Sequence, residues 1–423
     1  MSISSRLNLD KRSWNACKYS VKINLTFSDG TIRNLKSAQI VGIFLEKNFD
    51  RDHLPILMVD LALSKLDENK IDSDTIFHVR IDQFYLENND NNKEKRSKRI
   101  YLDEKFKRLD PKITIDTSEK IEKKSRKADN LSENDLSIND LTSKRTYVLV
   151  KKSDLELTKK IINSVLSNVD QESIVKYTLL KGRCTNKVLM SNFTNKNNHN
   201  QIILLPMPLL QQLLYLESEY GWHKEGTCIF LDFDTFYIIR MNGKPTAWRK
   251  NEITSVCFCI SDVTSEDNVS SGIIQQSNML YVNIGTDQYR LVDANEIEDQ
   301  ISGSNVLLFN TSTGLSEDIN SGTKGLDGTG AYSTKMYHGH NPYTKKQFVI
   351  RKKENQHIWE ITCTNGDISF FTPNKQFTFL SDVASINKEL KGNYRISSIK
   401  TNFIKNGNYF DTISTIYVKR TDV

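Results

Sequence analysis

Residues 21–35 read VKINLTFSDGTIRNL, and this stretch indicates the class of fold. Apolar and polar residues alternate along its first half, which is the period of a β-strand with one buried face and one wet face. The apolar positions are Val21, Ile23, Leu25 and Phe27. Ser28-Asp29-Gly30 then supplies turn chemistry before the chain returns from Thr31 to Leu35. The stretch therefore predicts an antiparallel pair of strands.

Further strand-like segments follow at 40–45, 56–63 and 77–81. The segment 56–63 is apolar on both faces except at Asp60, which is typical of a strand covered on both sides. No helical period separates these segments. The first 85 residues therefore predict an antiparallel sheet or a small β-barrel.

Residues 87–145 differ in composition, because 29 of these 59 residues are charged. Such a segment buries too little apolar surface to offset the entropy of ordering it. A piece from Ile100 to Phe106 is left open as a strand or a docking segment. We expect residues 116–145 to form a charged flexible linker or arm.

Residues 146–265 carry mixed α/β signals. Tyr147 to Val150 predicts a strand, and Ser153-x-x-Glu156 resembles a capping box before a helix expected over 154–168. Two more helices are expected at 171–180 and 209–216, the latter ending at Gly221. The apolar run Ile229 to Ile239 predicts a long strand.

Residues 266–423 return to β-structure. Strands are predicted at 358–363 and 368–372, and the segment 394–418 predicts a hairpin around Asn406-Gly407-Asn408. Residues 311–342 are rich in small and polar residues and predict a long loop, which is usually functional, interfacial or mobile.

Composition excludes several classes of protein. A length of 423 residues predicts two or three domains. Lys and Arg exceed Asp and Glu by 58 to 52, and this mild excess is unlike the concentrated basic face of a nucleic-acid-binding protein. Six cysteines are too few for a disulfide scaffold, no run is apolar enough for a membrane span, and no secretory signal is expected at the N-terminus.

Three patterns are candidates for chemistry, each beside a simpler interpretation. Asp232 and Asp234, two residues apart on a predicted strand, would share a face suited to Mg²⁺ or acid–base work; a wet strand face is the simpler interpretation. Cys257 and Cys259 are more simply two buried thiols than half of a zinc site. His338 and His340 fit a metal-binding loop or an exposed one.

Nucleotide-binding, nucleophile-elbow and zinc-protease motifs are absent from the sequence. On this basis we assign no catalytic residue, no cofactor and no metal.

Both ends and the middle of the chain resemble baseplate hub proteins of long-tailed, contractile-tail bacteriophages. At the N-terminal end, the element Asn48-Phe49-Asp50-Arg51-Asp52-His53-Leu54-Pro55 precedes an apolar strand, as in the small tail-hub barrel. The run YGWHKEGTCIFLDFD, residues 220–234, is similar to the α/β domain between hub barrels. ELKGNYRISSIKTNFIKNGNYFDTISTIYVKR, residues 389–420, resembles the last hub hairpin.

The resemblance implies a mainly β fold with two small hub-type β-barrel domains, an inserted α/β domain and long loops. The expected units are an N-terminal hub barrel (1–115), the arm (116–145), the α/β domain (146–265) and a C-terminal hub domain (266–423). It also implies a homotrimer in the virion, on the tail axis, and no enzymatic activity. The implied partners are the tail tube protein, the central spike protein and other baseplate proteins, without direct nucleic-acid contact or a membrane anchor.

Other functions remain open from the residues alone. The chain resembles a peripheral baseplate or tail-tube-adjacent component as well as the hub itself. A cell-wall-polymer hydrolase would use Asp232 and Asp234 as acid and base. A glycan-binding module would stack sugars on aromatic side chains, of which the candidates are Trp222, Trp248, Tyr337 and Tyr343.

Overall fold

The structure is a computed structural model of the 423-residue chain. It describes the following residues: 17–50, 54–87, 95–109, 142–241, 253–261, 273–276, 278–285, 287–292, 307–310, 315–318, 341–343, 347, 350, 358–373, 375–381 and 383–422. The segment 116–141, nearly all of the 311–342 loop, His338, His340, Trp248 and Tyr337 lie outside them.

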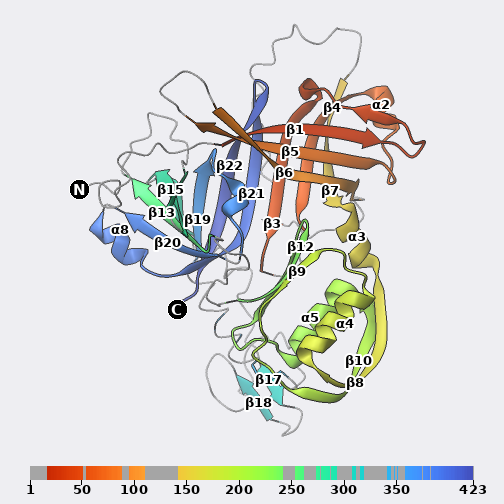
Figure 1. Cartoon of the computed structure of the whole chain (residues 1–423), viewed down its shortest axis with the longest axis vertical. Coiled ribbons are helices and arrows are strands. Elements are labelled where there is room, and N and C mark those ends of the chain that lie inside the picture. Colours follow the sequence, from red (N-terminus) through yellow and green to blue (C-terminus); the bar gives the residue numbers. More distant parts are fainter. Residues whose placement is uncertain are drawn as a thin grey trace, which may run out of the picture.

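Eight antiparallel strands close a β-barrel (Figure 1). Their order around the barrel is β21-β3-β4-β7-β6-β5-β1-β22, and β22 pairs back with β21. The strands are β1 (Cys17–Thr26), β3 (Ile40–Asn48), β4 (Ile56–Ser64), β5 (Ile76–Glu87), β6 (Lys95–Arg108), β7 (Thr142–Lys151), β21 (Tyr394–Asn406) and β22 (Tyr409–Arg420). The C-terminal hairpin thus completes a barrel whose other strands come from the first 151 residues.

The same hairpin also belongs to a second, open sheet. From β21 this sheet continues through β20, β13, β15 and β14, and from β22 through β19 and β16. These strands are β13 (Ser255–Ser261), β14 (Ile273–Gln276), β15 (Met279–Gly285), β16 (Tyr289–Leu291), β19 (Ile358–Thr364) and β20 (Gln376–Ser381). Within the described residues β14 and β16 do not pair. The β21–β22 hairpin is therefore a wall shared by the barrel and the open sheet.

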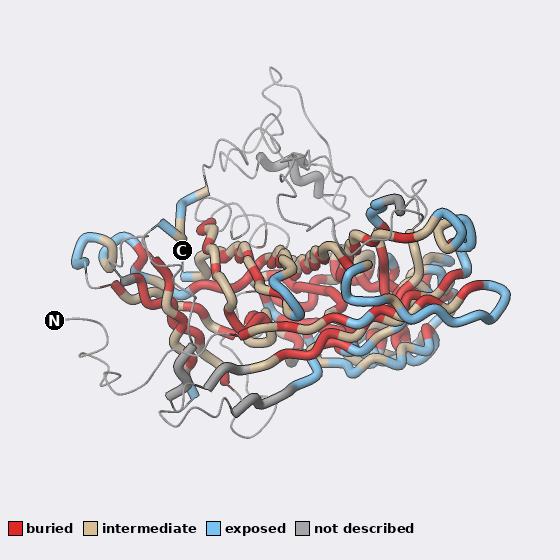
Figure 2. Tube along the Cα trace, turned by 90° about the horizontal axis from the view of Figure 1, so that it is seen from above, coloured by how far each residue is buried: buried red, intermediate tan, exposed pale blue. Residues whose placement is uncertain are grey.

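Alternation along the strands produces the core. In β1 every second residue from Cys17 to Leu25 is buried, and its neighbours are half-buried or exposed. Figure 2 shows buried segments running through the middle of the molecule, with exposed stretches at the loops. The predicted strand pattern over 21–27 is confirmed. Short elements decorate the sheets: β2 (Ile32–Asn34), η1 (Ser37–Gln39), α2 (Lys65–Asn69) and α8 (Ala384–Glu389).

The α/β unit follows β7 and has three layers. A two-stranded ribbon of β8 (Ile161–Asp170) and β10 (Asn198–Pro208) covers one side of α4 (Gln171–Lys181) and α5 (Leu209–Tyr220). On the other side lie β11 (Thr227–Asp232), β12 (Thr235–Arg240) and β9 (Lys187–Met190). Its core is separate from that of the barrel and includes the fully buried Trp222. The predicted helices at 171–180 and 209–216 are confirmed.

The helix expected over 154–168 is wrong. The structure has α3 (Lys152–Lys159) and then strand β8. The residue preceding α3 is Lys151, and no side chain caps the helix, so the capping-box interpretation of Ser153 and Glu156 fails. Apolar residues at Ile161 and Val165 instead lie on one face of a strand paired with β10, a pairing that β-branched residues favour.

Two other local expectations need correction. Residues 368–372 do not form a strand: η3 (Ile368–Phe370) is a 3₁₀ turn whose preceding residue, Asp367, accepts a hydrogen bond from Ser369 N. The charged segment after residue 87 contains the fourteen-residue strand β6, because Leu102 and Phe106 point into the barrel while charged neighbours face outward. Its last residues, 142–145, begin β7.

Described residues between β16 and β19 contact the α/β unit. This part of the chain also contains the hairpin of β17 (Leu307–Asn310) and β18 (Leu315–Asp318). Asn341 Nδ2 donates to the carbonyl of Ser218 at the end of α5 (3.2 Å), and Gln347 Nε2 donates to His223 O (2.7 Å). Gly221 has φ +61°, and a Cβ there would overlap the Asn341 amide. None of the described helices is long and apolar enough to cross a membrane.

Candidate functional site

The barrel and the α/β unit meet around the turn between β11 and β12. This turn, residues 232–234, lies against β6 and the end of β3 beside a cleft of about 250 Å³. The cleft is also lined by Arg99, Tyr101 and Ser369. The junction thus brings residues from the first, middle and last thirds of the chain together.

A buried ion pair ties the turn to the barrel. Lys47 Nζ on β3 lies 2.6 Å from Asp232 Oδ1, and the two side chains are only 9% and 11% exposed. The ammonium also lies 4.7 Å from the centre of the Phe233 ring, within the range of a cation–π contact. Burial opposes charging, but Asp232 and Tyr101 beside the ammonium hold the pKa of Lys47 above its usual value.

Phe233 turns the chain between the two strands. Its φ is +48°, a conformation that costs a non-glycine residue about 1–2 kcal/mol. In this conformation its carbonyl oxygen accepts hydrogen bonds from Lys151 Nζ and Asn186 Nδ2, both at 2.9 Å, and its ring packs edge-on against Phe106. These contacts offset the backbone strain and seat the turn on the barrel.

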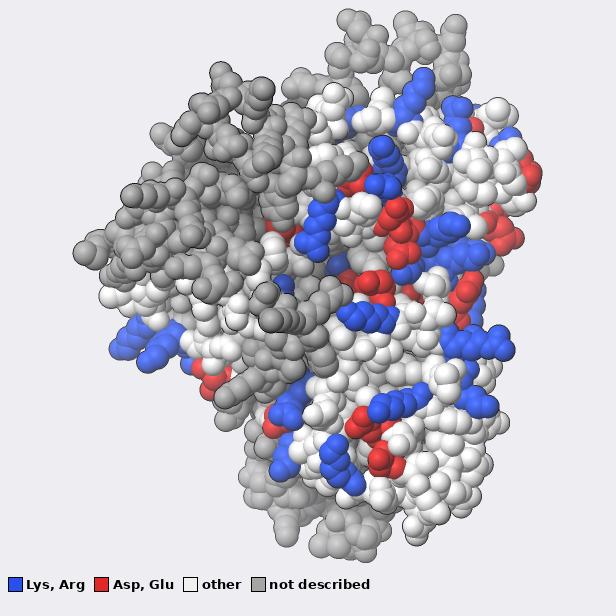
Figure 3. All heavy atoms as spheres, in the orientation of Figure 1, with Lys and Arg blue, Asp and Glu red and all other residues white. Residues whose placement is uncertain are grey.

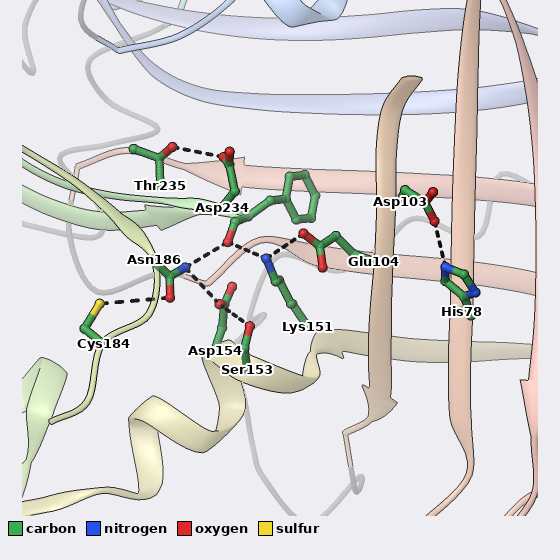
Figure 4. Close-up of polar contacts among 11 residues, drawn as sticks. His78, Asp103, Glu104, Lys151, Ser153, Asp154, Cys184, Asn186, Asp234 and Thr235 are labelled. Atoms are coloured by element: carbon green, nitrogen blue, oxygen red, sulfur yellow. Dashed lines mark hydrogen bonds and ion pairs between the residues drawn. The ribbon is translucent and has the colours of Figure 1, made fainter. Parts of the chain in front are cut away.

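Lys151 connects the same turn to β6. Its ammonium lies 2.8 Å from Glu104 Oε1, a contact drawn in Figure 4, and also donates to the Phe233 carbonyl oxygen. Lys151 is the last residue of β7, so the chain enters α3 from this contact. A charged residue at the strand end therefore fixes where the α/β unit begins.

Asp154, one turn into α3, is fully buried beside this cluster. Its Oδ1 lies 3.2 Å from Ser153 Oγ and 3.4 Å from Asn186 Nδ2, while Oδ2 has no hydrogen-bond partner among the described residues. Burial raises the pKa of Asp154 to about 6, although Lys151 partly opposes the shift. The carboxyl is therefore neutral in the folded chain at mildly acid pH.

Asp154→Asn is expected to stabilise the chain at alkaline pH. Because the folded pKa of Asp154 lies above the unfolded one, its stabilising contribution is full below pH 4 and is lost as pH rises through 6. Asparagine carries no such penalty, so the variant gains about 3 kcal/mol over the natural chain at pH 8 and little at pH 4. Urea unfolding at both pH values measures this, with the exposed Glu156→Gln as control. An equal effect at the two pH values would contradict it.

A second contact, next to Lys47 along the chain, binds the shared hairpin. Asp50 Oδ1 lies 2.5 Å from Arg395 Nη1 and Oδ2 lies 2.6 Å from Lys419 Nζ. Burial opposes ionisation, but the two cations hold the pKa of Asp50 well below its usual range. The neighbouring Phe49 is buried and packs edge-on against Phe230 of β11. The Phe49-Asp50 pair thus contacts the C-terminal hairpin and the α/β unit at once.

The structure separates the two candidate carboxylates. Asp232 ends β11, and Asp234 lies in the turn after it, so the predicted single strand through both residues is wrong. Asp232 is engaged by Lys47, whereas the exposed Asp234 accepts a hydrogen bond from Thr235 Oγ1. The break follows from the left-handed Phe233, which the apolar run concealed.

The candidates Cys257, Cys259 and Trp222 are buried and packed against other side chains. Cys257 and Cys259 are both buried on one face of β13, packed against Met279, Tyr281 and Leu380. Trp222 is fully buried and stacks on Phe193, which leaves no face for a sugar. Among the described residues no group of three His, Cys, Asp or Glu side chains could hold a metal ion.

Sequence reasoning missed Lys47, Lys151 and Asn186. Lysine and asparagine are common in this chain, and nothing local distinguishes these three from solvated residues. Asp50 and Phe49 did carry a signal, because they lie in the element that resembles hub proteins. On the face seen in Figure 3, acidic and basic side chains of the described residues intermingle. The junction pairs its charges internally, which suits rigid positioning of the units.

Comparison with solved structures found several tail proteins similar to the chain. It is similar in structure to the tail protein from Neisseria meningitidis MC58, with 9% identity, a TM-score of 0.47, and coverage of 95% of this chain and 97% of that chain. A 43 kDa tail protein of prophage MuSo2 from Shewanella oneidensis has 12% identity and a TM-score of 0.47, with 95% and 98% covered. Prophage tail protein gp18 from Listeria monocytogenes EGD-e has 8% identity and a TM-score of 0.42, with 94% of each chain covered.

No curated protein sequence matches the chain. A family model described as Bacteriophage PBS1 gene 109 protein matches residues 9–421, which is nearly the whole length. The chain therefore belongs to the Bacteriophage PBS1 gene 109 protein family.

Proposed function

We propose that the chain is a structural baseplate hub protein of a phage tail, which forms a threefold axial ring between the tail tube and the central spike. Membership of a bacteriophage family supports a virion role. The element around Asp50 and the hairpin segment 389–420, which both resemble hub proteins, contact each other through Arg395 and Lys419.

The shared hairpin is the observation that carries the proposal. Because β21 and β22 belong to both the barrel and the open sheet, each subunit presents two β units side by side. Three such subunits place six β units around an axis, which matches a sixfold tube on one side and a threefold spike on the other. The buried junction at Lys47 and Asp50 keeps the α/β unit in a fixed position on this ring.

The role is structural rather than catalytic. The carboxylate with the strongest claim to acid–base chemistry, Asp232, is nearly buried and paired with Lys47. A general acid or base needs access to its substrate at hydrogen-bond distance. The same pair serves rigidity, which a load-transmitting ring requires.

Light scattering after size exclusion tests the proposal on the full chain. At low concentration we expect a mass near three times 48.7 kDa, and co-elution with the tail tube and spike proteins of the same phage. A chain that stays monomeric in the presence of both partners, and binds neither, would overturn the hub role.

A further inference from the structure

The outer face of the β8–β10 ribbon is exposed and apolar. The inner residues Ile162, Ile202 and Leu204 are buried against the helices. The outward residues are large and apolar: Ile161 is 67% exposed, Val165 55% and Ile203 58%. Val165 and Ile203 lie directly opposite each other across the two strands. A cluster of this kind on a surface marks a contact site more often than scattered single residues do.

The ribbon is also uncharged and open along one edge. No Asp, Glu, Lys or Arg occurs in 161–169 or in 200–208, although 26% of the whole chain is charged. The edge of β10 carries Pro206, Pro208 and a register shift, which are features that discourage pairing. β8 has neither proline nor charge between its ends, and among the described residues only β10 pairs with it.

The sequence of β8 is complementary to itself in the antiparallel sense. With Val165 opposite Val165 of a second copy, Asn163 of each copy faces Ser167 of the other. Asn163, Val165 and Ser167 are exposed on the outward face of the strand, ahead of Asn168, whose φ of +52° interrupts the alternation. Apolar residues therefore meet apolar ones, and an amide meets a hydroxyl, which is the arrangement of stabilising cross-strand pairs.

We propose that the β8 edge is a twofold docking site for a second copy of this chain. The two ribbons join into one four-stranded sheet in the order β10-β8-β8-β10, with an apolar row of Ile203, Val165, Val165 and Ile203 across it. A contact of one strand edge is small beside a standard interface, so the association is weak and concentration-dependent. It does not rest on the hub proposal, because a twofold contact doubles either a monomer or a trimer.

Cysteine cross-linking tests the contact. Val165 lies on the twofold axis, where Cβ atoms of opposite residues are about 4.5–5.5 Å apart, near the range of a disulfide. We expect Val165→Cys to form a disulfide-linked dimer under mild oxidation on a non-reducing gel. Ile203→Cys is the matched control on the same ribbon, because its two copies would lie roughly 14 Å apart, three strand spacings. The natural chain, whose cysteines are mostly buried, gives the background.

The register is tested separately. A mixture of Asn163→Cys and Ser167→Cys chains is expected to cross-link, while each chain alone is not. In sedimentation, Val165→Lys is expected to weaken self-association about tenfold or more, since it sets like charges opposite each other. Cross-linking of Ile203→Cys in preference to Val165→Cys, or a mass doubling that Val165→Lys leaves unchanged, would overturn the proposal.

Discussion

Replacing Asp50 by alanine is expected to lower the free energy of unfolding by about 3 kcal/mol. The change removes the anion that contacts both Arg395 and Lys419, and those two side chains are just 8% and 14% exposed. Two nearby cations would then repel each other with little water to screen them. Because Asp50 joins the end of β3 to both strands of the shared hairpin, we expect the barrel and the open sheet to loosen together.

The loss depends on pH in a defined direction. The folded pKa of Asp50 is depressed, so its contribution is present above the unfolded value of about 4 and is lost as pH falls below it. Urea unfolding of the natural chain and of Asp50→Ala, followed by circular dichroism, should therefore converge at low pH. Glu46→Ala is the matched control: Glu46 joins the same β3 to Lys400 of β21, but at 3.9 Å and with more exposed partners. A change in Glu46→Ala as large as that in Asp50→Ala would show that the buried triad has no special weight.

Local pattern predicted much of the fold. The alternation at Val21, Ile23 and Leu25 is reproduced as buried positions of β1, and the last hairpin forms with its turn at Gly407. These successes share a cause. In an antiparallel sheet with one buried face, apolar and polar residues alternate along each strand, and this period of two is visible in the sequence. The failure at 154–168 has the opposite cause. There, apolar residues point to both faces of a ribbon, so no single period distinguishes strand from helix.

Barrel closure lay beyond local pattern. Local pattern predicts the hairpin 394–418 as part of a C-terminal unit. In the structure its strands also pair with the N-terminal strands, β21 with β3 and β22 with β1. Nothing in the hairpin's own residues says which other strands it meets. The Asp50 triad supplies that information, since an acid at the end of β3 selects two cations on the hairpin.

The junction site was unpredictable for the same reason. Lys47 and Asp232 are far apart in the sequence, and a lysine at a strand end is ordinarily solvated. Their pairing becomes specific only after the β11–β12 turn is folded, with Phe233 in its left-handed conformation. In the sequence, Asp232 is a candidate because it lies two residues from Asp234. The residue that determines its surroundings is Lys47, which lies on the barrel.

Lys47→Met is expected to cost about 3 kcal/mol of unfolding free energy, because it leaves the nearly buried Asp232 carboxylate without its counter-ion. The double variant Lys47→Met with Asp232→Asn is expected to recover most of that loss. Methionine keeps the contact with the Phe233 ring, and asparagine removes the uncompensated charge.

Urea unfolding followed by tryptophan fluorescence includes the signal of Trp222, which lies in the core of the α/β unit. The exposed Lys187→Met, on β9 of the same unit, controls for the loss of a lysine as such. If the Lys47–Asp232 pair holds the barrel and the α/β unit together, limited proteolysis will release the α/β unit faster from Lys47→Met than from the natural chain. The double variant will restore the slower release. Additive losses in the double variant would mean that Lys47 and Asp232 act separately, and the junction would then depend on Phe233 and Lys151 instead.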